Sequence, residues 1–163
     1  MFLNEVLEAL ESEKLSYALV GGMALVFHGI VRATMDVDVM IRVREADLRR
    51  VERALEAMGL ASRIPVRAQD IAAFKDEFIE RRNLIAWSFV DWARPSRAVD
   101  VMVKYDLRDF KVVRIKWGNL KVPVLTLEGL LRMKKEAGRA QDKADVEKIE
   151  AEISRRSESR KKR

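Results

Sequence analysis

The segment that most constrains the fold of this 163-residue chain is LVGGMALVFHGIVRATMDVDVMI, residues 19–41. Gly21 and Gly22 end a short apolar run, which is typical of a buried strand that turns into a helix. Further on, Asp36 and Asp38 lie in a segment with the alternation of a strand. Because strand side chains alternate between faces, the two carboxylates are expected on one face, where they repel each other and burial adds to the cost. A bound divalent cation removes this conflict, and carboxylate oxygens suit Mg²⁺.

A third acid lies in a similar setting, because Asp100 stands between two valines in AVDVMV. Three carboxylates on neighbouring strands can hold two metal ions, which activate a hydroxyl and stabilise a leaving phosphate oxygen. The step from a strand through Gly21 and Gly22 to a helix N-terminus offers backbone N–H groups to an anion such as a triphosphate. Each feature alone has a plainer alternative: a Gly-Gly turn, a D-x-D cap, or an Asp100 paired with Arg97 or Lys104. The combination in this order is the specific signal.

The remaining patterns predict a single α/β (α+β) domain over residues 1–153, with a mixed β-sheet flanked by helices and helices at the C-terminal end. A short helix is expected at 23–29, and Thr126 and Gly138 are expected to cap and end a later one. Residues 60–82 are ambiguous, apart from a helical pattern at 68–82. The other helical patterns cover 2–15, 44–59, 126–138 and 141–156, and the strand patterns cover 16–21, 36–43, 83–91, 97–105 and 112–126, the last with a turn at Gly118.

The amino-acid composition limits the classes of protein and of functional site that this chain can represent. The chain has no cysteine, which excludes disulfides and cysteine-based metal sites or nucleophiles. It shows no signal-peptide pattern and no apolar run of membrane-spanning length, so a cytoplasmic location is expected. The net charge is +6. Residues 154–163, SRRSESRKKR, hold six bases and one acid, so the body carries only +1. We expect a disordered basic tail there; the alternative is a nucleic-acid-contacting arm.

Gly21-Gly22, Asp36-x-Asp38 and Asp100 together resemble the signature of the nucleotidyltransferase superfamily that includes DNA polymerase β. The string GGMALVFHGIVRATMDVD is similar to small prokaryotic members, the abortive-infection type nucleotidyltransferase toxins, and more distantly to the aminoglycoside and lincosamide nucleotidyltransferases. MKKEAGRAQDKADVEKI resembles a helical segment of the toxin-like group. The recurrent Lys, Arg, Asp and Asp positions of that segment fall on Lys134, Arg139, Asp142 and Asp145. Asp142 and Asp145 also have the three-residue spacing of a helix cap and its reciprocal acid.

The resemblance implies a polymerase β-like fold and Mg²⁺-dependent transfer of a nucleoside monophosphate from an NTP to an acceptor hydroxyl, with release of pyrophosphate. Two Mg²⁺ ions are expected, with Mn²⁺ as an alternative. Asp36, Asp38 and Asp100 would be the catalytic metal ligands, and Asp100 would also help to deprotonate the acceptor. Gly21 and Gly22 would bind the triphosphate.

Three further residues are candidates for nucleotide binding. In the resembling group, the loop that holds Arg32 and Thr34 borders the active site, so these side chains would orient phosphate or the metal-binding strand. Their alternative is a loop salt bridge and a hydroxyl turn contact. Lys134 is a candidate for the triphosphate, and its alternative is a solvated helix face. His28, the only histidine, is expected to be structural.

The acceptor and the partners are less constrained. An RNA or tRNA end, or a partner protein, suits this near-neutral body better than a cationic aminoglycoside, which would need an acidic pocket. A toxin–antitoxin role follows from the resemblance. The rival functions are a nucleotide-binding regulatory or antitoxin-like protein with little turnover, and an RNA-binding module that uses the basic tail.

Overall fold

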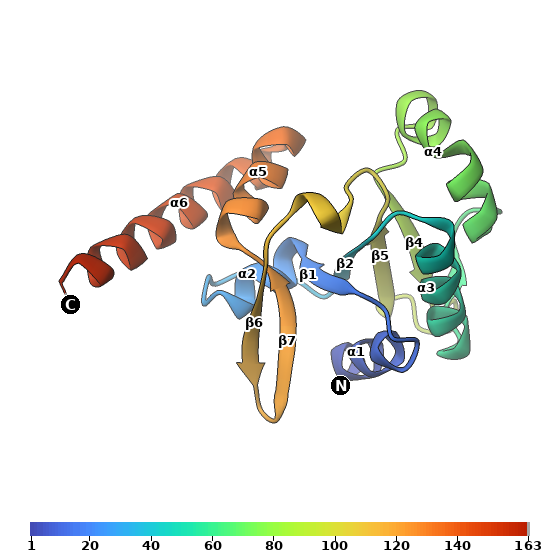
Figure 1. Cartoon of the computed structure of the whole chain (residues 1–163), viewed down its shortest axis with the longest axis horizontal. Coiled ribbons are helices and arrows are strands. Elements are labelled where there is room, and N and C mark those ends of the chain that lie inside the picture. The colour runs from blue at the N-terminus through green and yellow to red at the C-terminus, as the bar shows by residue number, and fades with distance from the viewer. Residues whose placement is uncertain (163) are drawn as a thin grey trace.

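The computed structural model of the chain describes residues 1–162 and contains one mixed sheet of seven strands (Figure 1). The strand order is β3-β4-β5-β2-β1-β7-β6. β2 runs parallel to β5 and β1 runs parallel to β7, while β1 and β2 are antiparallel. The predicted mixed sheet is therefore confirmed. The strands are β1 (Tyr17–Val20), β2 (Val37–Ile41), β3 (Ala61–Ser62), β4 (Ala86–Val90), β5 (Ala98–Met102), β6 (Val112–Trp117) and β7 (Leu120–Leu125).

The helices form two groups around this sheet. α1 contacts α3, which contacts α4, whereas α2 lies against β1, β2 and β7, and α5 packs along α6. No helix within residues 1–162 is both long enough and apolar enough to cross a membrane. The helices are α1 (Phe2–Ser12), α2 (Gly21–Phe27), α3 (Glu45–Ala57), α4 (Ala68–Arg82), α5 (Leu127–Ala137) and α6 (Ala140–Lys161), with a short 3₁₀ helix at Leu107–Asp109.

The predicted helix cap, helix stop and hairpin turn are present in the structure. The Thr126 hydroxyl accepts a hydrogen bond from the Gly129 N–H at 3.3 Å and caps α5. Gly138 ends this helix with a positive φ of 65°, a conformation that L-residues with a side chain rarely adopt. The turn at Gly118 joins β6 to β7, as predicted. Local chemistry therefore fixes where α5 begins and ends, and α5 carries Lys134.

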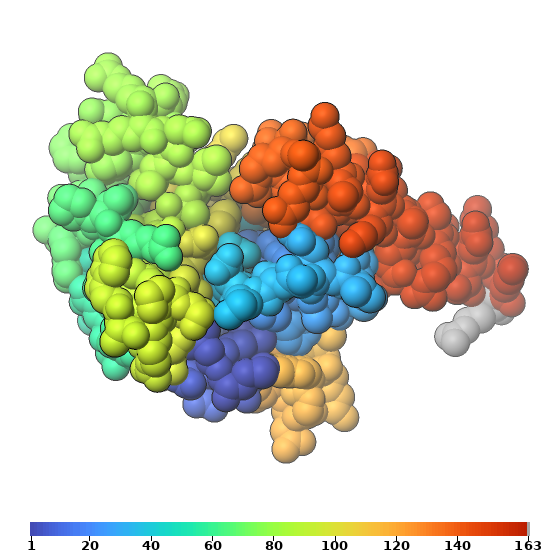
Figure 2. Space-filling view, turned by 180° about the vertical axis from the view of Figure 1, so that it is seen from behind, coloured from blue at the N-terminus to red at the C-terminus, as the bar shows by residue number. Residues whose placement is uncertain are grey.

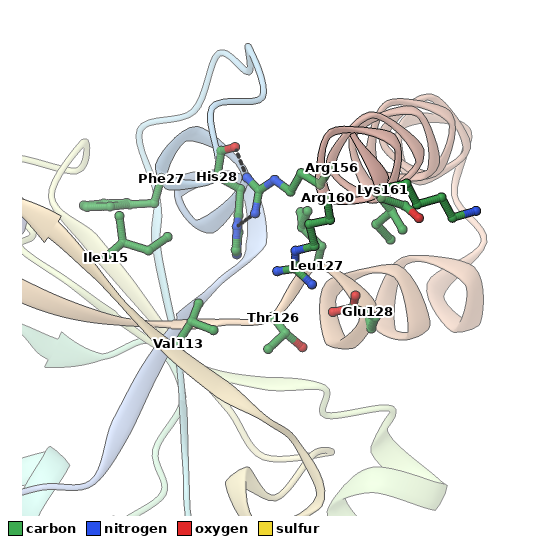
Figure 3. Close-up of a pocket in the computed structure, with 12 residues that line it drawn as sticks. Phe27, His28, Val113, Ile115, Thr126, Leu127, Glu128, Arg156, Arg160 and Lys161 are labelled. Atoms are coloured by element: carbon green, nitrogen blue, oxygen red, sulfur yellow. Dashed lines mark hydrogen bonds between the residues drawn. The ribbon is translucent and has the colours of Figure 1, made fainter. Parts of the chain in front are cut away.

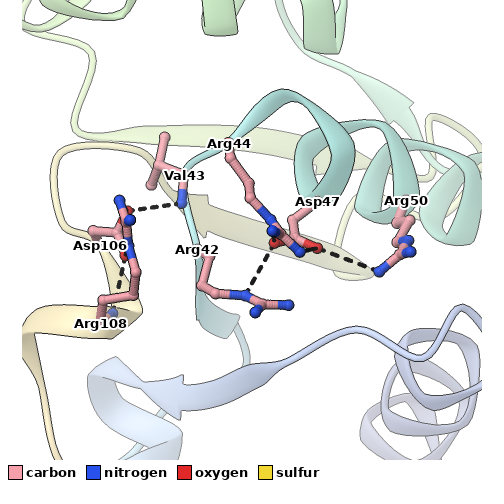
Figure 4. Close-up of polar contacts among 7 residues, drawn as sticks. All are labelled: Arg42, Val43, Arg44, Asp47, Arg50, Asp106 and Arg108. Atoms are coloured by element: carbon pink, nitrogen blue, oxygen red, sulfur yellow. Dashed lines mark hydrogen bonds and ion pairs between the residues drawn. The ribbon is translucent and has the colours of Figure 1, made fainter.

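A buried carboxylate holds the far end of β2 (Figure 4). Asp47, in the first turn of α3, is fully buried and forms ion pairs with Arg42 at 3.1 Å, Arg44 at 2.6 Å and Arg50 at 3.5 Å. Partnered charge is the usual condition for burying a carboxylate. This cluster fixes β2 at the end opposite to Asp38.

Two expectations differ from the structure. The segment from residue 154, predicted to be disordered, continues as helix to Lys161. No glycine or proline interrupts it, and Glu152 pairs with Arg155 at 2.7 Å and with Arg156 at 2.6 Å along the helix. Asp142, expected to cap α6, is instead the third helical residue, and its carboxylate accepts the backbone N–H of the N-cap residue Arg139 at 3.2 Å.

Candidate active site

Asp38 and Asp100 are direct neighbours on adjacent strands. β2 and β5 are parallel and pair Asp38 with Asp100 in register. Paired positions on neighbouring strands project to the same face of a sheet, and the strands are about 4.8 Å apart. The pairing therefore places the two carboxylates beside each other. Like charges so close together are costly unless a cation lies between them.

Gly21 lies directly beside this pair, because Val20 at the end of β1 is paired with Asp38. The backbone of Gly21 has a φ of +64°, and a Cβ added there would lie 2.0 Å from Oδ2 of Asp38. A side chain at this position would both strain the backbone and displace the carboxylate. Gly22 is confined as well, since a Cβ there would lie 2.8 Å from Cβ and Oγ1 of Thr34. The two glycines thus allow the carboxylate and the loop to approach the start of α2.

Asp36 lies one step before β2, in the loop that follows α2, and its side chain is exposed. This loop forms part of the molecular surface beside the α5–α6 pair (Figure 2). The pKa of Asp38 is raised to about 7 by burial and then by the negative charges of Asp100 and Asp36. Lys134 and Arg139 partly oppose this rise. Two acids and two bases therefore act electrostatically on Asp38.

The nearby cations are paired with other acids. Lys134 is only 12% exposed, and its Nζ lies 3.0 Å from Asp142 and 2.8 Å from Asp145. Arg139 pairs with Asp142 at 2.6 Å, and Arg32 pairs with Asp145 at 3.2 Å. Lys134 is thus not on a solvated helix face, and Arg32 forms the salt bridge that was its alternative. The sequence marked Asp142 and Asp145 by the family resemblance and by their spacing, but not by their partners. In the structure they join the loop before β2 to both C-terminal helices.

These acids suit Mg²⁺ in their chemistry. Within residues 1–162, no three histidine or carboxylate side chains form a group that could itself hold a metal ion. Mg²⁺, however, is commonly bound by one or two carboxylates together with substrate phosphates and water. Asp38 and Asp100 supply two hard oxygen ligands that repel each other, and Asp36 is close enough to affect Asp38. The donor set therefore fits a nucleotide-bound Mg²⁺, and the assignment of each ligand stays a prediction.

His28 has the structural role that was expected. Its Nε2 lies 2.7 Å from the carbonyl oxygen of Leu125, so Nε2 carries the proton and donates. Burial, the largest cause, lowers its pKa, which favours the neutral ring. Arg156 donates to the His28 carbonyl at 2.8 Å. These bonds attach the C-terminal half of α6 to the end of α2, a contact that the sequence did not reveal.

Comparison with known proteins places this arrangement in a family. Residues 5–144 match the model of the family "Nucleotidyl transferase AbiEii toxin, Type IV TA system". The chain belongs to the AbiEii nucleotidyltransferase toxin family. It is therefore a nucleotidyltransferase, and the resemblance noted in its sequence is confirmed. No curated protein matches the chain significantly.

Solved structures agree with the AbiEii fold. The lincosamide antibiotic adenylyltransferase LnuA, solved with lincomycin, is 14% identical, with a TM-score of 0.61 over 91% of this chain and 94% of its own. ANT(2″)-Ia, in complex with adenylyl-2″-tobramycin, is 12% identical, with a TM-score of 0.59 over 96% of each chain. A nucleotidyltransferase-like protein from Paracoccidioides brasiliensis is 17% identical, with a TM-score of 0.55 over 94% of this chain and 75% of its own. At such identities the likeness concerns the fold alone.

Proposed function

We propose that this AbiEii-family chain transfers a nucleoside monophosphate from an NTP to a hydroxyl group at an RNA end, such as that of a tRNA. The observation that carries the proposal is the in-register pair of Asp38 and Asp100 beside Gly21. An acidic pair next to a backbone that requires glycine suits a metal-bound triphosphate better than it suits a structural role. The family match supports the reaction class, and the choice of acceptor is our own inference.

In the proposed reaction, the acceptor hydroxyl oxygen forms a bond to the α-phosphorus of the NTP. The bond from this phosphorus to the oxygen bridging the α- and β-phosphates breaks, and pyrophosphate leaves. Asp100 accepts the hydroxyl proton, and Asp36 and Asp38 with Asp100 hold Mg²⁺, with Mn²⁺ as an alternative. When bound, the two ions supply the positive charge that neutralises the phosphates.

The remaining candidates position the nucleotide. Lys134 lies within electrostatic reach of Asp38 and is held by Asp142 and Asp145, so its ammonium group is pre-oriented beside the proposed triphosphate position. Gly21 and Gly22 let the triphosphate approach the backbone, and Thr34 packs over Gly22. Preorganised charge of this kind needs no rearrangement during the reaction.

The C-terminal half of α6 favours an anionic acceptor over a cationic one. Lys134, Arg139 and Arg32 are already paired with Asp142 and Asp145, but the C-terminal half of α6 is rich in arginine and lysine. A polyanion gains from such a surface, whereas a polycationic drug is repelled. RNA is therefore the proposed acceptor, and a partner protein is the other outcome of the test.

The test uses each of the four NTPs labelled at the α-phosphate, with Mg²⁺ and either total RNA or total protein. We expect label on RNA that nuclease removes, and none when Asp100→Asn replaces the wild-type chain. Label on protein alone would overturn the RNA proposal and retain transfer. Binding of NTP without label on either acceptor would support the regulatory nucleotide-binding alternative.

A further inference from the structure

One long edge of the sheet is open. β6 is the last strand in the order, and no strand within residues 1–162 pairs with its outer side. The Thr126 N–H donates to the Lys111 carbonyl at 3.1 Å, so these two residues form a hydrogen-bonded pair at the start of the antiparallel β6–β7 ladder. Because bonded positions alternate in such a ladder, the backbone groups of Val112, Arg114 and Lys116 point away from β7. Unpaired groups of this kind are a template for another strand.

The two faces of β6 differ sharply. Val113 and Ile115 contribute to the wall of a cavity of about 940 Å³ between β6, the end of α2 and the C-terminal half of α6 (Figure 3). Much of its lining is apolar, and Arg156, Arg160 and Lys161 also line it. Val113 is 38% exposed, although it is apolar. The other apolar lining residues are Phe27, Leu127 and Ile153.

The opposite face of the hairpin is basic. Lys116 on β6 is paired directly with Lys121 on β7, and both side chains are exposed. Arg114 lies on the same face of β6 and is also exposed. Like charges directly opposite each other destabilise a sheet. An acidic side chain next to β6 would relieve this repulsion.

We propose that β6 binds an extended acidic segment of a partner protein, which adds to the sheet as an eighth strand. Apolar side chains at every second position of the segment would enter the cavity beside Val113 and Ile115. The intervening acidic side chains would face Arg114, Lys116 and Lys121. Main-chain hydrogen bonds give affinity in such strand addition, and the pockets for alternate side chains give specificity. This inference is independent of the proposed transfer reaction.

Two other occupants suit this surface less well. A second copy paired through its own β6 would bring Arg114 and Lys116 against the same residues of its partner, which is a like-charge contact. RNA could not pair with alternating backbone donors and acceptors, and it has no apolar side chains to place in the cavity beside Val113 and Ile115. The combination of an open edge, an apolar cavity and a basic face therefore favours an acidic peptide.

The test measures binding of a fluorescein-labelled peptide of about ten residues, in which glutamate alternates with leucine or valine, by fluorescence anisotropy. A control peptide has the same composition in two blocks. We expect the alternating peptide to bind at least about 10-fold more tightly, because only it can match both faces of β6. Lys116→Glu should weaken its binding about 10-fold, whereas Arg81→Glu, an exposed charge reversal on α4, should leave it unchanged.

Hydrogen exchange followed by NMR distinguishes strand addition from charge attraction. The alternating peptide should slow exchange of the amides of Val112, Arg114 and Lys116, which point outward. Equal binding of both peptides, or binding without this protection, would overturn the proposal in favour of simple electrostatic adsorption. A dimer in the free protein that protects the same amides would overturn it in favour of a second copy. An RNA hairpin that displaces the peptide and binds more tightly would overturn it in favour of a nucleic-acid surface.

Discussion

Replacing Asp38 with asparagine should stabilise the metal-free protein, although it removes a proposed metal ligand. Burial and the negative charges of Asp100 and Asp36 raise the pKa of Asp38 from 3.8 to about 7. The unfolded chain lacks these effects, so folding at neutral pH must either protonate this carboxyl group or retain an unfavourable charge. Asparagine has a similar shape and removes the charge.

The size of this stabilisation follows from the dependence of the unfolding free energy on the pKa of Asp38. Because the pKa is higher in the folded state, the wild-type protein loses stability as the pH rises from about 4 to about 7, and the loss is complete above the folded-state pKa. At about 1.4 kcal/mol for each pH unit, the total is about 4 kcal/mol at about pH 8. At about pH 5 it is less than half of that value. The gain from Asp38→Asn should therefore grow with pH.

Urea unfolding in the presence of EDTA measures this gain at about pH 5 and about pH 8. Asp76→Asn on α4 is the matched control, since its side chain is exposed and its charge is not one of those that raise the pKa of Asp38. Adding Mg²⁺ with a nucleotide should stabilise the wild-type protein more than the Asp38→Asn variant, because a ligand stabilises the state that binds it. The charge conflict inferred for this site would be refuted by either of two results. One is an Asp38→Asn variant less stable than the wild type at about pH 8; the other is a gain in stability that is the same at about pH 5 and about pH 8.

Three further predictions concern the surroundings of the acids. Gly21→Ala should reduce transfer and stability more than Gly118→Ala, in activity and urea assays, because both positions have positive φ but only Gly21 faces Asp38; equal effects would exclude the contact. Lys134→Met should cost about 3–5 kcal/mol in unfolding free energy, since it leaves buried acids unpaired, whereas Lys135→Met on the exposed face should cost less than about 1 kcal/mol. Lowering the pH from about 4 towards about 2 should destabilise the native state. The bonds from Arg139 and Lys134 outweigh burial and hold the pKa of Asp142 at about 2, so the folded protein resists protonation of this carboxyl group. Thermal melting of the wild type and of Asp142→Asn over this pH range checks the prediction.

The acidic pair could be predicted from sequence because it depends on local rules. Alternation within each strand places Asp38 and Asp100 at strand positions, and the glycines mark a turn that cannot tolerate side chains. What the sequence does not contain is the strand order, which sets β2 beside β5 and pairs the two acids in register. The resemblance to a known family supplied the expectation that the two acids meet, and the structure shows the strand pairing that brings them together.

Long-range contacts account for what was missed. The C-terminal segment has the composition of a disordered tail, but Arg156 donates to the carbonyl of His28, which lies 128 residues earlier. No local pattern predicts such a bond. The two-residue strand β3 was also missed, since it is defined only by its pairing with β4. Similarly, the sequence shows Lys134 only as one of two adjacent lysines. Only the fold shows that Lys134 is largely shielded from solvent while Lys135 is exposed.

The most direct test of the account compares binding and transfer in Asp100→Asn. Isothermal titration with Mg²⁺ and the preferred NTP measures binding, and the α-phosphate transfer assay measures turnover on the same preparations. We expect nucleotide affinity to fall only slightly, because Asp36 and Asp38 remain, and the transfer rate to fall by at least about 10²-fold, because Asp100 is needed for the acceptor proton. If the variant transferred nucleotide as fast as the wild type, the pairing of Asp38 with Asp100 would not be the catalytic centre.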